Sequence, residues 1–120
     1  MIEAMKISEI AALANAEVLA CPELLGTEVF SACGSDMMSD VLAFVKDQGL
    51  LITGLVNTQV VRTAEMMDMR AILFVRNKRP TPEIIELAEK CEIVVMASPL
   101  RMFEACGLIY ESGLKSTALK

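Results

Sequence analysis

Residues 71–96, AILFVRNKRPTPEIIELAEKCEIVVM, contain a strand, a helix and a second strand in that order. Ala71–Val75 is a continuous apolar run, which is typical of a strand buried on both faces of a sheet. The Thr-Pro-Glu at 81–83 supplies an N-cap residue, a first-turn proline and a first-turn acid, so a helix is predicted to begin there. Ile93–Met96 predicts the next strand. Such a unit is a right-handed crossover between parallel strands.

The same alternation continues along the chain on the N-terminal side and once more on the C-terminal side. Further strands are predicted at 16–20, 29–33 and 50–54. Further helices are predicted at 6–14 with Ser8 as N-cap, at 38–45 with Val45 on its apolar stripe, from Asn57 to Met67, and from Ser98 to about Ser112. The fold class predicted is α/β with three layers: a predominantly parallel sheet of about five strands, with helices on both faces.

Length and composition set the broad class. The 120 residues are predicted to form a single domain, 1–120, because the chain shows no linker or low-complexity tract. Hydrophobic residues make up 54% of the chain and the mean hydropathy is +0.50, yet no run reaches the roughly 18 apolar residues of a membrane span. Buried strands or partner surfaces must therefore accommodate the apolar excess, and no membrane association is expected.

Charge and missing motifs exclude several functions. Sixteen acidic and 11 basic residues give a net charge of −5 with no basic run, which argues against nucleic-acid binding. The chain has no histidine, no P-loop and no G-x-G-x-x-G, so we expect neither an enzyme nor a bound cofactor or metal. The N-terminal residues lack a secretory pattern, so a cytoplasmic location is expected.

In a parallel α/β fold, ligands bind beyond the carboxyl ends of the strands. Four turns follow the predicted strands: 34–36, 53–57, 76–79 and 97–101. Their small, hydroxyl, amide and basic residues are typical of a site for a nucleotide-like anion. The candidate ligand residues are Ser35, Asp36, Thr53, Gly54, Asn57, Ser98 and Arg101. Helix capping and turn formation alone also account for most of these residue types.

Two features point to partner surfaces or redox chemistry. The last predicted helix has a second apolar stripe of Phe103, Gly107, Tyr110 and Leu114 beside its core-facing one. Either an element of the same chain or a second subunit would cover it, and a homodimer is the simplest form of the latter. The four cysteines show no C-x-x-C pair and are expected to be small buried hydrophobes. Thiol sensing through Cys33 or Cys106 would require an accessible thiol of lowered pKa.

Four segments carry a family resemblance. Ser35–Phe44, Leu50–Leu55, Gln59–Glu65 and Met102–Gly107 resemble the short stand-alone DRTGG-domain proteins of anaerobic bacteria. The DRTGG domain is itself similar to the N-terminal domain of HPr kinase/phosphorylase. The resemblance implies an α/β fold with a parallel sheet and no kinase centre. In larger proteins the domain accompanies CBS domains, which implies a regulatory or nucleotide-sensing role. The Thr-Gly-Gly of the family is Thr53-Gly54-Leu55 here, and its Asp-Arg pair has no counterpart upstream.

Two functions of different classes follow. In the first, the chain is a non-catalytic regulatory module that binds a nucleotide-like anion at the strand-end turns and signals to a protein partner, which the sequence does not identify, through a Met-rich helical face. In the second, it is a ligand-free interaction or adaptor protein, homodimeric, in the redox or signalling system of an anaerobe. An open cleft at the turns would favour the first, and an exposed apolar helix face would favour the second.

Overall fold

A central sheet of five strands organises the protein. The computed structural model describes residues 4–43 and 49–115. In spatial order the strands are β2 (Glu17–Ala20), β7 (Val94–Ala97), β6 (Ala71–Phe74), β5 (Leu50–Thr53) and β4 (Ala32–Gly34). The three pairings among β4, β5, β6 and β7 are parallel, and β2 pairs with β7 antiparallel at one edge. The predicted α/β class and the predominantly parallel sheet are confirmed.

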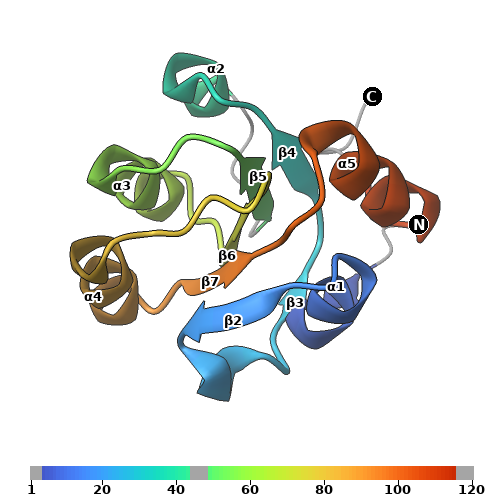
Figure 1. Ribbon diagram of the computed structural model, residues 1–120, viewed down its shortest axis with the longest axis horizontal. Helices are drawn as coiled ribbons and strands as arrows, with labels where there is room; N and C mark the ends of the chain where they lie inside the picture. Colours follow the sequence, from blue (N-terminus) through green and yellow to red (C-terminus); the bar gives the residue numbers. More distant parts are fainter. Residues whose placement is uncertain (1–3, 44–48, 116–120) are drawn as a thin grey trace.

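Helices cover both faces of this sheet, as predicted (Figure 1). One face carries α2 (Met38–Leu42), α3 (Thr58–Met66) and α4 (Pro82–Cys91), and the other carries α1 (Ile7–Leu13) and α5 (Met102–Glu111). Two separate hydrophobic clusters fill the spaces between the layers. None of these helices combines the length and the apolar character needed to cross a membrane.

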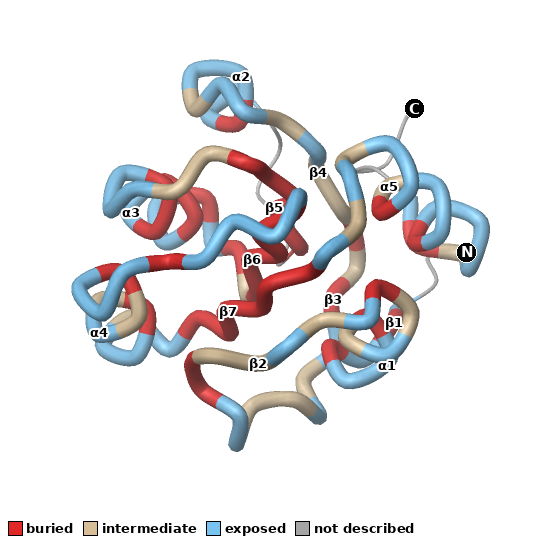
Figure 2. Tube along the Cα trace, in the orientation of Figure 1, coloured by how far each residue is buried: buried red, intermediate tan, exposed pale blue. Residues whose placement is uncertain are grey.

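The inner strands explain the apolar composition. Every residue of β5, β6 and β7 is buried, and Figure 2 shows this burial running through the middle of the molecule. Successive side chains of a strand point to opposite faces, so Leu73 joins the cluster under α1 and α5 whereas Ile72 and Phe74 join the cluster under α3 and α4. Both faces of these strands are buried against helices, so each strand is a continuous apolar run.

The single strand predicted at 29–33 is wrong, because this segment divides between two sheets. β3 (Glu28–Val29) pairs antiparallel with β1 (Met5–Lys6), and β4 begins only at Ala32. The guanidinium of Arg70 donates a 2.8 Å hydrogen bond to the carbonyl of Glu28, so β3 is held outside the main sheet. The change of partner depends on contacts distant in sequence, and a local apolar pattern cannot report it.

Helix starts were predicted correctly where the cap is local. Asn57 accepts a 3.1 Å hydrogen bond from the N–H of Val60, and Thr81 accepts a 3.3 Å bond from that of Ile84. Ser8, by contrast, is not the N-cap of α1, which is Lys6. The N–H groups of Ile7 and Ser8 are satisfied by the carbonyls of Thr27 and Leu25, so no serine cap is needed.

The start of α5 was predicted four residues too early. Its N-cap is Arg101, and Ser98 is a buried residue of the preceding loop. The carbonyl of Ser98 accepts the N–H of Asn77 at 2.9 Å, so it is not free to accept the N–H of Met102 in a helical bond. Val45, assigned to the stripe of the helix at 38–45, lies outside the described residues.

Candidate ligand site at the carboxyl edge of the sheet

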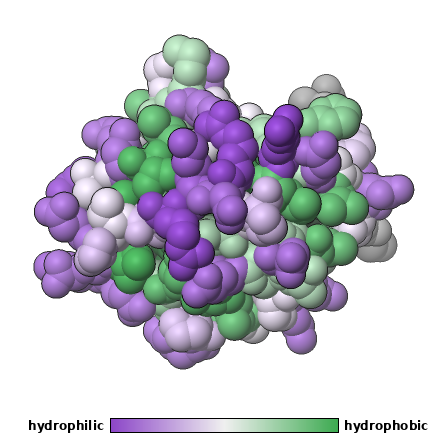
Figure 3. Space-filling view, in the orientation of Figure 1, coloured by the Kyte–Doolittle hydropathy of each residue, from purple (hydrophilic) through white to green (hydrophobic). Residues whose placement is uncertain are grey.

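The four predicted turns lie at one edge of the molecule. Parallel strands place their carboxyl ends together, and β4, β5, β6 and β7 are parallel. In Figure 1 the connections from β5 to α3, from β6 to α4 and from β7 to α5 run in front of the strands. Figure 3 shows strongly hydrophilic side chains gathered over the middle of this same face.

Asp36 joins three of these turns. One oxygen of its carboxylate, Oδ1, accepts hydrogen bonds from the N–H of Gly54 at 2.7 Å and from the hydroxyl of Thr53 at 3.1 Å. The other oxygen, Oδ2, lies 3.7 Å from Nη2 of Arg76. The side chains of Arg76 and Asp36 are 47% and 46% exposed, so solvent weakens this ion pair. The structure therefore brings together three predicted residues, and Arg76 completes the group.

The position of Arg76 depends on glycine at position 54. A Cβ added to Gly54 would lie 2.8 Å from the guanidinium carbon of Arg76, so the guanidinium occupies the space of the missing side chain. Arg76 and Asn77 have φ values of 60° and 59°. Their N–H groups donate to the carbonyls of Leu100 and Ser98 at 2.7 and 2.9 Å. These bonds tie the loop after β6 to the loop after β7.

An open groove lies beside this group, with a volume of about 580 Å³. Its lining residues come from the two tied loops and the first turn of α5: Arg76, Asn77, Pro99, Arg101, Met102 and Phe103. Arg101 is exposed and forms no ion pair within the described residues. The side chain of Phe103 is 85% exposed, which is unusual for a phenylalanine. The groove thus combines two guanidinium groups, an amide and an uncovered aromatic ring.

The other predicted site residues have local partners. The Ser35 hydroxyl accepts from the N–H of Met37 at 3.0 Å and lies 3.2 Å from its carbonyl oxygen. The Asn57 side chain caps α3. The Ser98 hydroxyl donates to the carbonyl of Ala14 at 2.6 Å and accepts from the N–H of Leu100. These bonds account for all three side chains as parts of the fold, and a ligand role for them stays a prediction.

Of the six residues that line the groove, the sequence reasoning selected only Arg101, and Arg76 and Phe103 are the most informative of those it missed. Arg76 lay in a predicted turn but was not selected, and Phe103 was assigned to an apolar stripe. The available signal was an arginine directly after the clearest strand, together with an aromatic residue two positions beyond Arg101. The sequence alone could not show that Arg76 and Phe103 line the same groove, because their proximity depends on the hydrogen bonds between the two loops.

The sequence matches the family model of the DRTGG domain over residues 9–112. This chain belongs to the DRTGG domain family. The DRTGG fold is also found in a similar solved structure, that of the CBS and DRTGG domains of the regulatory region of Clostridium perfringens pyrophosphatase. That protein is complexed with its activator, diadenosine tetraphosphate. The TM-score is 0.72 at 20% identity, over 96% of this chain and 52% of that one.

At 20% identity this likeness concerns the fold, and the present chain spans about half the length of its neighbour. Among curated proteins, none matches the sequence. Leu55, which follows Gly54, packs against the hydrophobic cluster under α3 and α4.

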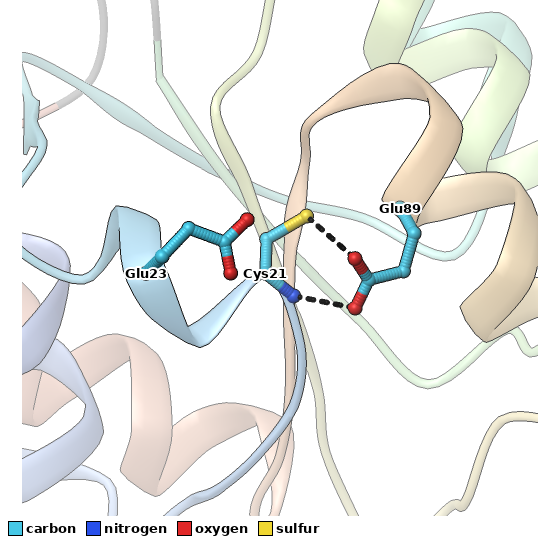
Figure 4. Close-up of side chains that lie close together, drawn as sticks. All are labelled: Cys21, Glu23 and Glu89. Atoms are coloured by element: carbon cyan, nitrogen blue, oxygen red, sulfur yellow. Dashed lines mark hydrogen bonds between the residues drawn. The ribbon is translucent and has the colours of Figure 1, made fainter.

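Cys21 forms a separate polar cluster in the DRTGG domain, between β2 and α4 (Figure 4). Its N–H donates to Glu89 Oε2 at 3.0 Å, and its Sγ lies 3.8 Å from Oε1. Burial, followed by the charges of Glu89 and Glu23, raises the pKa of the Cys21 thiol to about 11. One donor atom of each of these three residues lies within 4.8 Å of the others, the arrangement a metal ion would need. The Cys21 backbone and thiol form a hydrogen-bonded link between the segment after β2 and α4.

The other cysteine environments do not favour thiol sensing. Burial raises the pKa of Cys106, and burial followed by nearby charges raises that of Cys33. A sensor thiol needs the opposite shift, because the thiolate is the reactive form. Cys33 packs against the α3 and α4 cluster and Cys106 against the α1 and α5 cluster.

Proposed function

We propose that this DRTGG domain is a non-catalytic regulatory module that binds a nucleotide-like polyphosphate in the groove between the loops after β6 and β7. The observation that carries the proposal is the convergence of Arg76 and Arg101 on one open groove at the carboxyl edge. Guanidinium groups bind phosphate through paired, charge-assisted hydrogen bonds. In a chain of net charge −5, two arginines directed to one groove indicate an anionic ligand.

The remaining groove residues fit the other parts of a nucleotide. The exposed ring of Phe103 offers a flat apolar surface on which a base can stack. The side-chain amide of Asn77 can bond a sugar hydroxyl or a phosphate oxygen. The regulatory region of the clostridial pyrophosphatase has an adenine dinucleotide as its activator, which supports a ligand of this class.

Thermal unfolding with a panel of adenine and guanine nucleotides, with and without magnesium, tests the proposal. A ligand at ten times its Kd stabilises the native state by about 1.4 kcal/mol, which raises Tm by roughly 6 °C in a domain of this size. Arg101→Ala should weaken binding by about ten-fold or more, because it removes charge-assisted bonds. Arg62→Ala, an exposed arginine on α3, is the matched control. No shift at millimolar nucleotide would contradict the proposal.

A second candidate function rests on the outer face of α5. Phe103 and Tyr110 are 85% and 60% exposed, and an apolar groove runs between them past Gly107 and Leu108. Exposed aromatic residues of this kind are enriched in protein interfaces. In this reading the protein is a cytoplasmic adaptor and a homodimer through α5, and any ligand is secondary.

A further inference from the structure

We propose that Asp36 is a built-in anion that occupies a second phosphate subsite at the Thr53–Gly54 turn, and that a polyphosphate ligand displaces it. The inference rests on the proposed function and adds to it a subsite and a competitor within the chain. It also assigns the ligand class more narrowly, to anions with at least two linked phosphates.

The donors around Asp36 are those that hold phosphate oxygens. A backbone N–H from Gly54, a hydroxyl from Thr53 and a guanidinium from Arg76 converge on one carboxylate, at 2.7, 3.1 and 3.7 Å. Backbone N–H groups at strand-end turns, hydroxyls and arginine are the usual donor set for phosphate. The Asp36 carboxylate therefore lies where a phosphate oxygen of a ligand would accept the same bonds.

Two of the donors are buried, whereas the carboxylate is exposed. Thr53 and Gly54 are buried at the end of the inner strand β5, so their positions are set by the core. Asp36 is exposed and belongs to the short connection between β4 and α2. Its removal would leave the Gly54 N–H and the Thr53 hydroxyl without their present acceptor, which is unfavourable unless another acceptor replaces it. An incoming phosphate supplies that acceptor.

Arg76 joins the two subsites. It pairs with Asp36 on one side and lines the open groove with Arg101 on the other. A single phosphate can bind in the groove without disturbing Asp36. A chain of two or more phosphates can extend past Arg76 to the Thr53–Gly54 turn, and it must then displace the carboxylate. Asp36 thus lowers the affinity for linked phosphates more than that for orthophosphate.

Calorimetric titration of the full chain with inorganic tripolyphosphate and with orthophosphate tests the inference. We expect Asp36→Ala to bind tripolyphosphate about ten-fold more tightly than the wild type, because the ligand no longer competes with a carboxylate. Asp40→Ala is the matched control: it changes the net charge equally, one helical turn away on an exposed position of α2. It should change the affinity by less than about three-fold. In Asp36→Ala, orthophosphate should gain less affinity than tripolyphosphate, because a single phosphate can occupy only one of the two subsites at a time.

Two further measurements keep the inference testable if Asp36→Ala fails to fold. Asp36→Asn preserves the shape of the side chain and should give a smaller increase in affinity. In the wild type, saturating tripolyphosphate should shift the amide resonance of Gly54, whereas orthophosphate should not. An unmoved Gly54 resonance would overturn the inference, as would folded Asp36 variants that bind tripolyphosphate no better than Asp40→Ala.

The outcomes separate this inference from the proposed function. Nucleotide binding that depends on Arg101 but not on Asp36 would overturn the inference alone. Tight tripolyphosphate binding by Asp36→Ala, with no nucleotide bound by the wild type, would support the inference and contradict the proposed function. No anion bound by any of the proteins would overturn both.

Discussion

The position of the Arg76 guanidinium depends on the absence of a side chain at Gly54. The Arg76 guanidinium lies in the space that a Cβ would fill, so Gly54→Ala should displace it from both Asp36 and the groove. We expect at least a several-fold loss of tripolyphosphate affinity by calorimetry. Gly107→Ala is the control, because a Cβ there meets nothing within 4 Å. On an exposed helical position it should stabilise the protein by about 0.5–1 kcal/mol. Equal affinity in the Gly54→Ala protein would contradict the assigned position of Arg76.

At the residue scale, the raised pKa of Cys21 makes the free energy of unfolding depend on pH. Its pKa rises from 9.0 to about 11 on folding, so the folded state keeps a proton that the unfolded chain loses between these values. This stabilisation is complete below pH 9 and is lost as the pH rises toward 11. We expect the free energy of unfolding to fall by about 2 kcal/mol over this range. Cys21→Ala should reduce that slope in denaturant titrations, with Cys33 and Cys106 contributing what remains, and an unchanged slope would refute the assignment.

At the scale of elements, variants of Asn57 at the start of α3 distinguish a capping role from a ligand-binding role. Asn57 accepts the N–H of Val60 in the geometry of an N-cap. Asn57→Ala should therefore cost about 1 kcal/mol of stability, and Asn57→Asp should restore most of it. If Asn57 acts only as a cap, nucleotide affinity in the folded Asn57→Ala protein equals that of the wild type. A loss of affinity that Asn57→Asp does not restore would give Asn57 a ligand role as well.

The helix α5 shows how one element can serve two purposes. Ala105 and Ile109 are buried against the sheet, whereas Phe103 and Tyr110 face outward. The first turn contributes to the groove beside Arg76 and the remainder to the exposed apolar face. Ligand binding at the N-terminal end of α5 and a partner on its outer face would therefore act on the same rigid element.

At the scale of the whole molecule, the α5 face predicts the oligomeric state. In the homodimer of the second candidate function, Tyr110→Asp would bury a charge in the interface and should yield a monomer by light scattering, with the thermal transition retained. Arg62→Asp on α3, in the opposite layer, should leave the mass unchanged. A wild type that is monomeric at high micromolar concentration would contradict the homodimer.

The sequence by itself determined the layers, the buried strands and the edge at which the turns after the parallel strands meet. Uninterrupted apolar runs such as Ala71–Phe74 can be satisfied only by burial on both faces, and parallel strands bring their carboxyl ends together. It also identified the caps at Asn57 and Thr81, because each bonds an N–H three residues away. These features follow from the spacing of apolar residues along the chain, from residue type and from hydrogen bonds between residues close in sequence.

Only the tertiary structure decided what happens at that edge. Asp36 meets Gly54 across 18 positions, and Arg76 meets Asp36 across a further sheet connection. The tie between the loops after β6 and β7 moved the start of α5 to Met102 and created the groove. The division of the strand at 29–33 likewise depended on a partner near the N-terminus. Contacts between distant segments depend on the packed geometry, and no local pattern in a single sequence encodes which donor will reach which carboxylate.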